Sequence, residues 1–306
     1  MIKTTTETKI TATASSSSNN QDNSKKPPIK QGAQNISQGF PTPFPVPTSF
    51  ASVYHHRKWM LEHMAGAFRV FARKGYNEGG AGHISLRDPE DPNTFWINPL
   101  NIHFGLLKAS DMVRVDEEGN VIGGNQVAVN AAGFKIHSAL HKARPDVNAA
   151  CHTHSIYGKA WSCFGKPVEM LNQDSCTFHG CQAVYTDFGG VVLESEEGEK
   201  IAEALGEQNK VVILQNHGLL TTGETIDEAA YRFTLLENTC HAQLLADSNL
   251  NFKKNFIADE QAAYTREMVG DSETLYGDFQ NDYLMEVKLC NGDFLFPEDY
   301  DLETIK

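Results

Sequence analysis

The sequence lacks several features that would mark particular classes of protein. No stretch approaches the roughly twenty consecutive apolar residues of a membrane-spanning helix, so we expect no transmembrane segment. The six cysteines are scattered, without a CxxC pair, which is typical of free thiols in a reducing compartment. Basic residues are scarce: the chain has 26 lysines and arginines but 39 aspartates and glutamates, which gives a formal net charge of −13. This balance argues against a nucleic-acid or anionic-membrane partner, and we expect a cytoplasmic protein.

The composition divides the chain into three parts. Residues 1–48 are rich in serine, threonine, asparagine and lysine, with almost nothing apolar to bury, which predicts a disordered low-complexity tail. A transit peptide is the alternative for this tail, but such peptides favour arginine, and the first arginine is Arg57. We expect the folded domain over 49–250. Residues 251–306 are expected to form a helical or irregular extension, packed on the same domain or on a neighbouring subunit.

Helical and strand-like patterns alternate in the first half of the folded part. Apolar residues recur at helical spacing from Met60 to Phe71. The patterns predict, in order, a helix ending near Gly75, strands at 83–87 and 94–98, two strands around a turn at 118–120, and a helix over 130–142.

The second half continues the alternation. It predicts a strand ending in the histidine pair of "NAACHTHS", a helix from Ser155, strands around Val184 and Val191, a helix over 196–205, a buried strand at 210–215, and a long helix opened by a capping box at Thr225 and Glu228. Interleaved helices and strands predict an α/β fold in layers around one core.

The spacing of His152 and His154 predicts a metal site. Residues two apart on a strand point to the same side, about 7 Å apart along the chain. Two imidazoles hold a metal poorly, and the best third ligand is His217, which follows the apolar strand 210–215. Gly218 next to it allows a sharp turn with close backbone approach. Three nitrogens at one rim of a sheet suit zinc, at about 2.0–2.1 Å, or another divalent metal.

Other interpretations of the histidine pair remain open at this point. With twelve histidines in the chain, an HxH pair also arises by chance, as two solvated imidazoles in a turn. Amidohydrolases carry HxH on a strand too, but they need the regular repeats of a βα-barrel, which this sequence does not show.

Three stretches resemble the class II aldolase/adducin family, and most resemble an adducin-like fungal branch of it. They are "GGAGHISLRDPEDPNTFWINPLNIHFGLLKASDMVRVDEEGNVIGG", "HKARPDVNAACHTHSIYGKAWS" and "LQNHGLLTTG", in matching order over roughly Ser52 to Asp247. The resemblance implies a three-layer α/β/α sandwich around a mainly antiparallel sheet, commonly a tetramer with sites at subunit interfaces. It also implies that His152, His154 and His217 are the zinc ligands.

The chain departs from the sugar-phosphate aldolases of that family at their catalytic motif. Their Ser-Ser-Glu motif, whose glutamate is the acid/base, corresponds to Ala131, Ala132 and Gly133. His83 replaces an asparagine of their phosphate loop, and Leu100-Asn101 replaces a Thr-Gly pair. Phosphate sites depend on small residues, hydroxyls and bare N–H groups, so these changes argue against a standard phosphate pocket.

Several further residues are candidates for the site. We expect His83, Asn98 and Asn101 to contact substrate, and the alternative for His83 is that it only begins a strand. Asp174 and His179 are candidates to replace the missing acid/base, because both lie between the ligand motifs. Their alternatives are a helix cap or turn for Asp174 and an exposed loop position for His179.

Two functions follow from this pattern. The first is a zinc-dependent, lyase-type (aldolase-like) or related enzyme that acts on a small carbonyl or hydroxy compound, as a homo-oligomer. Three protein ligands leave a metal an open position, as catalytic sites require. The second is a non-catalytic, adducin-like scaffold or actin-associated protein, for which the lysine-rich tail of adducins has no counterpart in the acidic "GDFLFPEDYDLETIK".

Overall fold

The computed structural model describes residues 43–190, 195–249 and 251–306. Most of the tail predicted to be disordered, and the strand predicted around Val191, lie outside these residues. The described chain forms one eight-stranded sheet in the order β4-β3-β2-β1-β5-β8-β7-β6. The strands are β1 (His83–Arg87), β2 (Phe95–Ile97), β3 (Val113–Val115), β4 (Val121–Gly124), β5 (Ala149–Thr153), β6 (Gln182–Tyr185), β7 (Val211–Leu214) and β8 (Gly218–Gly223).

Strand pairing makes this sheet mainly antiparallel. Every neighbouring pair runs antiparallel except β6 and β7, which are parallel. The middle of the sheet is β1-β5-β8, where His83 pairs with His152, and His152 pairs with Leu220. Because side chains alternate between faces along a strand, this register places His83 and His152 side by side on one face.

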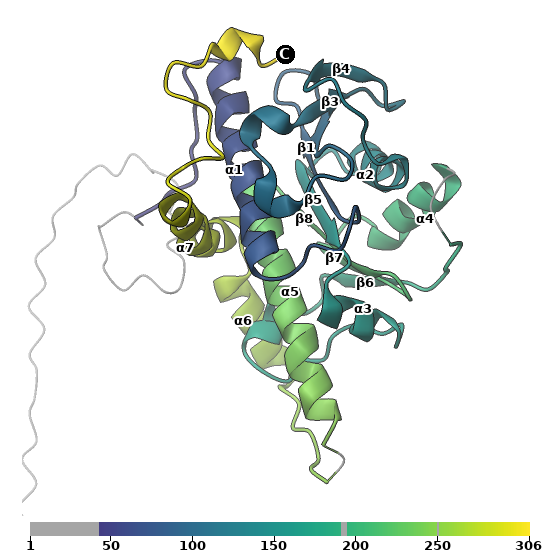
Figure 1. The fold of residues 1–306 in the computed structure, drawn as a ribbon. Coiled ribbons are helices and arrows are strands. Elements are labelled where there is room, and N and C mark those ends of the chain that lie inside the picture. The colour runs from purple at the N-terminus through teal and green to yellow at the C-terminus, as the bar shows by residue number, and fades with distance from the viewer. Residues whose placement is uncertain (1–42, 191–194, 250) are drawn as a thin grey trace, which may run out of the picture. The chain divides into compact units, whose positions relative to one another are not determined.

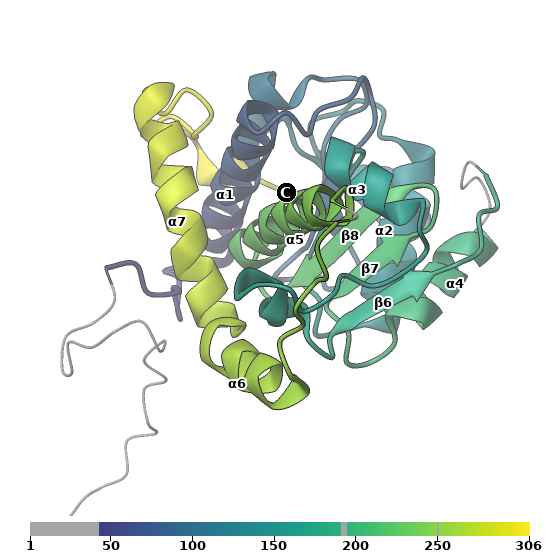
Figure 2. The same cartoon turned by 90° about the horizontal axis from the view of Figure 1, so that it is seen from below.

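One face of the sheet is covered by the long helices α1 (Val53–Arg73) and α5 (Ile226–Asp247), together with α3 (Ile156–Ser162), and α7 (Ser272–Leu289) packs against α1 and α5 on the same side (Figures 1 and 2). Ile84, Cys151 and Ile213 point to this side and join the core formed with Phe68 and Phe233. Burying such apolar side chains contributes about 1.5–3 kcal/mol each. This core therefore fixes the central strands from behind.

The opposite face is covered by α2 (Ala131–Ala143) and α4 (Ser195–Leu205) (Figure 2). Val212, Leu214 and Leu220 point to this side and pack with Ile136 and Ile201. The odd and even positions of β7 thus serve two different cores, which explains the continuous apolar run in its sequence. Helices on both faces give the three-layer α/β/α sandwich that the family resemblance implies.

Local sequence signals set the helix ends close to the predicted positions. Ser52 caps α1 by accepting a hydrogen bond from the backbone N–H of His55, and Gly75 follows the helix with φ of +80°. Asn130 caps α2 by accepting from Gly133, and Thr225 caps α5 by accepting from Glu228. Strand β1 has the bounds predicted for it, whereas β2 is shorter than the predicted 94–98.

The remaining described elements surround this sandwich. They are the helix α6 (Asp259–Val269) and the short 3-10 helices η1 (Phe104–Leu106), η2 (Ala109–Asp111), η3 (Asp174–Phe178) and η4 (Leu302–Thr304). Helix α6 contacts η3, and α7 contacts α1 and α5, so part of residues 251–306 packs on the same domain. Within the described part of the chain, no helix combines the length and apolarity needed to cross a bilayer.

Candidate metal centre

The end of β5 carries the histidine pair. His152 is the fourth residue of β5, and His154 lies one residue beyond its end. Ala149 and Cys151 alternate with them and are buried in the opposite core, against α1 and α5. The period-two alternation of the strand therefore turns both imidazoles toward the α2 side, as the HxH spacing predicts.

A hairpin that the sequence analysis did not predict delivers the third histidine. β7 pairs antiparallel with β8, with Leu214 opposite Gly218, so His217 lies in the tight turn between them. Asn216 in this turn adopts a left-handed φ of 59°. Thr153 pairs with Leu219, which places this turn beside the end of β5. A Cβ on Gly218 would come within 3.1 Å of the carbonyl oxygen of Thr153, so a glycine allows the close approach.

The three imidazoles converge on one point. One ring nitrogen from each of His152, His154 and His217 lies within 4.8 Å of the others. The Nε2 atoms of His154 and His217 are 3.1 Å apart. The ring centroids are 4.8–5.2 Å apart, and the planes cross at 72–80°. Nearly perpendicular rings aim separate lone pairs at a shared centre, which is the arrangement of three ligands around a cation.

A hydrogen bond orients one of the rings, and a carboxylate lies near a second. Nδ1 of His152 lies 2.8 Å from the carbonyl oxygen of Leu219, to which it donates, so Nε2 is left to bind a metal. Nδ1 of His154 lies 3.9 Å from a carboxylate oxygen of Glu78. Glu78 also accepts hydrogen bonds from Nζ of Lys159, at 2.5 and 2.7 Å. Such partners are the outer layer that metal-binding histidines usually have.

Burial keeps the imidazoles in the form that binds metals. It lowers the pKa of His217 to about 4, with repulsion from His154 adding to the effect. Burial, followed by repulsion from the neighbouring histidines, also holds the pKa of His152 well below its usual value. The pKa of His154 is lowered by burial, against the opposing effect of Glu78. Neutral imidazoles with free lone pairs fit a divalent cation with nitrogen preference, such as zinc.

The triad opens into a cavity of about 440 Å³. Its described lining is Ala81, His83, Asn130, Ala132, Gly133, Ile136, His152, His154, Lys159, Phe188, Gly190, Asn216 and His217. This volume falls within the usual range for small-molecule sites, about 300–1,000 Å³. Its described lining contains no serine, threonine, arginine, aspartate or glutamate. The cavity therefore combines a nitrogen-rich end with walls of small and apolar residues.

Among the other sequence-predicted site residues, only His83 lies on this cavity. Asn98 is buried and holds the backbone before β1, since its side chain accepts from the N–H of Ile84 and donates to Gly82. Asn101 lines a separate cavity of about 310 Å³. The structure brings neither asparagine to the histidine triad.

Asp174 and His179 lie apart from this cavity. Asp174 is exposed at the start of η3, in the turn setting that was its alternative interpretation. His179 is 3.4 Å from Asp259, and its carbonyl oxygen accepts from Arg266 on α6. Neither residue is part of the described lining, so a role in catalysis for them rests on sequence order alone.

The structure also adds residues that the sequence analysis did not select. Lys159 is the one cationic side chain in the described lining, and Glu78 connects it to His154. Glu237 of α5 is buried and accepts from Ser155 Oγ and from the backbone N–H of Gly158. It thereby holds the start of α3 directly after His154. No local pattern marks these residues, because each lies 76–82 residues along the chain from the residue that it contacts.

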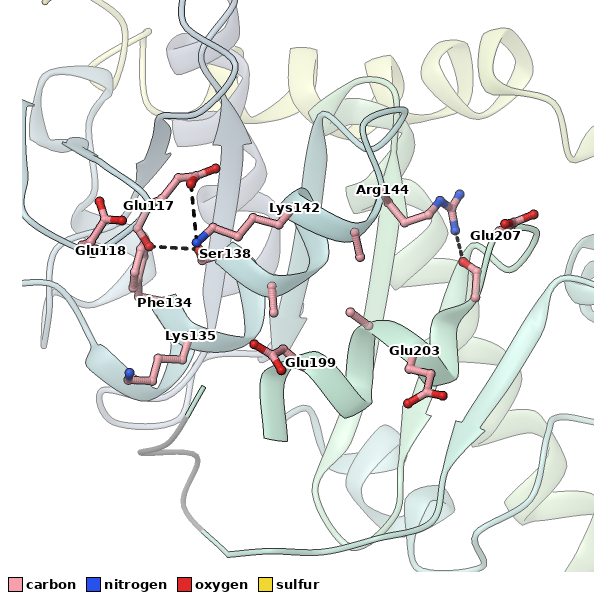
Figure 3. A pocket seen from close by; sticks show the side chains of 14 residues that line it. Glu117, Glu118, Phe134, Lys135, Ser138, Lys142, Arg144, Glu199, Glu203 and Glu207 are labelled. Carbon is pink, nitrogen blue, oxygen red and sulfur yellow. Dashed lines mark hydrogen bonds and ion pairs between the residues drawn. The ribbon is translucent and has the colours of Figure 1, made fainter. Parts of the chain in front are cut away.

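A larger groove, of about 880 Å³, runs between α2 and α4 (Figure 3). Two of its cationic side chains pair locally: Lys142 lies 3.6 Å from Glu117, and Arg144 donates to the carbonyl oxygen of Gly206. Figure 3 shows the carboxylates of Glu199 and Glu203 along its α4 side. No histidine or cysteine lines the described part of this groove, so we place the chemistry at the histidine triad.

Comparison with known proteins assigns the family. The family described as "Class II Aldolase and Adducin N-terminal domain" matches residues 62–244, more than half of the chain. The protein therefore belongs to the class II aldolase/adducin family, and its eight-stranded α/β sandwich has the fold of that family's solved members. Members of this family are typically dependent on a divalent metal, which the histidine triad suits.

Particular relatives show the range of the family. The chain is 46% identical over 245 residues to the "Meiotically up-regulated gene 14 protein" of Schizosaccharomyces pombe, which covers 80% of this chain and 95% of that protein. It is 43% identical over 206 residues to "Decarboxylase NovR" of Streptomyces niveus, and the match covers 67% of this chain and 76% of that protein. The solved "L-fuculose 1-phosphate aldolase from Glaciozyma antarctica PI12" is 43% identical, with a TM-score of 0.75, over 82% of this chain and 97% of that chain.

Proposed function

We propose that this protein is a zinc-dependent, lyase-type enzyme that acts on a small, unphosphorylated carbonyl or hydroxy compound. The observation that carries the proposal is the convergence of three neutral imidazoles on one cavity. Two relatives, one named an aldolase and one a decarboxylase, support chemistry at a carbon–carbon bond. Both reaction classes break a carbon–carbon bond and leave negative charge on one of its two carbons.

His152, His154 and His217 would hold the metal. When bound there, zinc supplies Lewis-acid polarisation of a substrate oxygen and stabilises negative charge that develops beside it. The carbonyl of Leu219 keeps His152 in the tautomer with Nε2 available. Lys159 offers a positive charge at the cavity wall, while Ile136 and Phe188 exclude water from its apolar part.

The lining supports an unphosphorylated substrate. Phosphate sites in proteins use hydroxyls, guanidinium groups and clusters of free backbone N–H groups. The described lining has neither hydroxyl nor guanidinium side chains, and Lys159 is its one cationic group. The solved relative is named for a phosphorylated sugar, so the choice of substrate is the point on which this chain is proposed to differ from it.

We also propose a cytoplasmic homo-oligomer, in line with the tetramer that the family resemblance implies. Ile156 and Tyr157, which follow His154 by two and three residues, are 64% and 36% exposed. Exposed apolar side chains on a protein surface are typical of areas that a second subunit covers. Sedimentation velocity of the full chain tests this, and a monomer at micromolar concentration would contradict it.

A direct experiment compares metal content with turnover. The purified full chain is assayed for zinc and then offered L-fuculose 1-phosphate, unphosphorylated hydroxy-ketones and 2-oxo acids, with and without a chelator. We expect turnover of an unphosphorylated compound that is lost with chelator, restored by zinc and absent in His217→Ala. The matched control is His55→Ala, an exposed histidine on α1. Turnover of the phosphorylated sugar alone would contradict the proposed substrate, and chelator-resistant turnover would contradict the proposed cofactor.

The second candidate is an adducin-like scaffold that keeps its metal without catalysis. One observation favours it: no carboxylate lines the described part of the cavity, and Gly133 stands at the position of the family's acid/base. Zinc bound at one ion per chain with no turnover of any compound in the panel would support this alternative. Co-sedimentation with filamentous actin then tests the cytoskeletal form of it.

A further inference from the structure

His83 is a buried polar side chain without a partner. It begins β1, lines the cavity beside the histidine triad, and is only 6% exposed. Neither Nδ1 nor Nε2 forms a hydrogen bond within the described structure. A buried polar group left unpaired is destabilising, so buried polar atoms normally have partners. A ring kept in this condition on the wall of a cavity is typical of a group that pairs with a ligand.

Gly133 creates the space that this ring occupies. A Cβ on Gly133 would lie 2.3 Å from Nδ1 and Cε1 of His83, far inside van der Waals contact. The helix cannot easily shift, since the N–H of Gly133 donates to Asn130 Oδ1 at 3.0 Å at the start of α2. A side chain at position 133 and the imidazole of His83 therefore exclude one another. The polar group in this part of the cavity comes from β1 and not from α2.

None of the rings around His83 pairs with its nitrogens. Its ring lies roughly parallel to that of His152, with centroids 6.1 Å apart and planes at 18°. Behind it, His137 lies edge-on at 5.9 Å. Nδ1 of His137 is 2.7 Å from Ser85 Oγ, which is also 2.7 Å from Nε2 of His141, so the supporting ring is fixed. Nε2 of His137 has no partner either, so neither ring satisfies the other.

We propose that His83 contacts the substrate, binding a carboxylate oxygen of a 2-oxo or 2-hydroxy acid that carries an apolar substituent. This inference rests on the proposed function, because it places the acid at the same site as the three metal-binding histidines. An N–H donor and the cation of Lys159 on one cavity suit a single carboxylate. Ala132, Ile136 and Phe188 supply the apolar wall that the substituent contacts.

Calorimetric titration of the zinc-loaded full chain with 3-phenyllactate tests this inference without turnover. We expect binding to the wild type, a dissociation constant at least tenfold higher in His83→Leu, and partial recovery in His83→Gln, whose amide can still donate. His55→Leu, on the exposed surface of α1, is the matched control and is expected to bind as the wild type does. Zinc content and melting temperature, measured for each variant, show that the triad and the fold are retained.

Gly133→Ala provides a second test that leaves the chemistry of the imidazole unchanged. It is expected to weaken binding of 3-phenyllactate by displacing His83, and to have no further effect in the His83→Ala background. Equal affinity of the wild type and His83→Leu, with zinc retained in both, would overturn the inference. Binding of inorganic phosphate in place of 3-phenyllactate, or no binding of 3-phenyllactate, would also overturn it, even if turnover of another compound upheld the proposed function.

Discussion

His152 donates a hydrogen bond from Nδ1 to the carbonyl oxygen of Leu219, 2.8 Å away on the neighbouring strand. Leu219 follows the turn that carries His217, and Thr153 pairs with it in the sheet. The carbonyl group of Leu219 thus sets the tautomer of His152, and Leu219 itself lies two residues after His217. The triad is therefore built into the pairing of β5 with β8.

Removal of one ligand is expected to abolish metal binding. In His217→Ala, two imidazoles remain, and they hold a divalent ion poorly. A ligand present at 100 times its dissociation constant stabilises the folded state by about 2.7 kcal/mol. We therefore expect added zinc to raise the melting temperature of the wild type and of the surface variant His55→Ala, but not of His217→Ala. Differential scanning calorimetry measures this, and an equal zinc response in all three proteins would rule out the triad as the site.

Glu78 is expected to strengthen metal binding through His154. Its carboxylate lies 3.9 Å from Nδ1 of His154 and pairs with Lys159. Loss of such an outer partner typically lowers metal affinity by about 10–100-fold. We expect Glu78→Gln to raise the zinc dissociation constant about tenfold in a competition titration against a chromophoric chelator. Glu118→Gln, an exposed carboxylate at the α2–α4 groove, is the control, and an unchanged affinity in Glu78→Gln would count against the role.

Glu237 is expected to contribute to stability by holding the start of α3. Its carboxylate accepts from Ser155 Oγ at 2.6 Å and from the backbone N–H groups of Tyr157 and Gly158, at 2.8 and 2.7 Å. Glu237→Gln replaces one acceptor oxygen by an NH₂ group that faces these donors. We expect the free energy of unfolding to fall by about 2–3 kcal/mol in urea titrations. Glu203→Gln, exposed on α4, should leave it within about 0.5 kcal/mol of the wild type.

Acidification is expected to destabilise the protein through His141. Burial lowers the pKa of His141 to about 3 in the folded state, against about 6.5 in an unfolded chain. Between these values the unfolded state binds a proton that the folded state does not. The free energy of unfolding therefore falls as pH drops below about 6.5, by about 1.4 kcal/mol per pH unit for this group.

His141→Gln isolates this contribution. Urea titrations between pH 6 and 4.5 should show a pH slope that is smaller by about one proton in this variant than in the wild type. His55→Gln, on the exposed surface of α1, should keep the wild-type slope. Equal slopes in His141→Gln and the wild type would show that the buried ring does not govern the acid response.

Most elements could be predicted because their signals are local. Local patterns predict the end of α1, both ends of α2 and the start of α5 close to their observed positions, and they predict the bounds of β1. Strand β8 was missed because "GLLTTG" has glycine at both ends and no alternating pattern. It forms a strand because β5 and β7 pair with it on both sides.

The site was only partly predictable, because its side chains are brought together by contacts between distant parts of the chain. His83 was a candidate that the structure places on the cavity, whereas Asn98 and Asn101 lie elsewhere. Asp174 and His179 were selected because they lie between the histidine motifs in the sequence. Chain order carries no information about which side chains meet across a sheet, so Glu78 and Lys159 were not selected.

The sequence by itself determined the layered α/β class, the two histidine motifs, and the absence of a carboxylate at Gly133. These follow from residue identity and from periodicity along a few neighbouring residues. Only the tertiary structure decided that His217 reaches His154, and that His83 fills the space left by Gly133. These side-chain contacts depend on strand register and helix packing, which are set by residues distant in the chain.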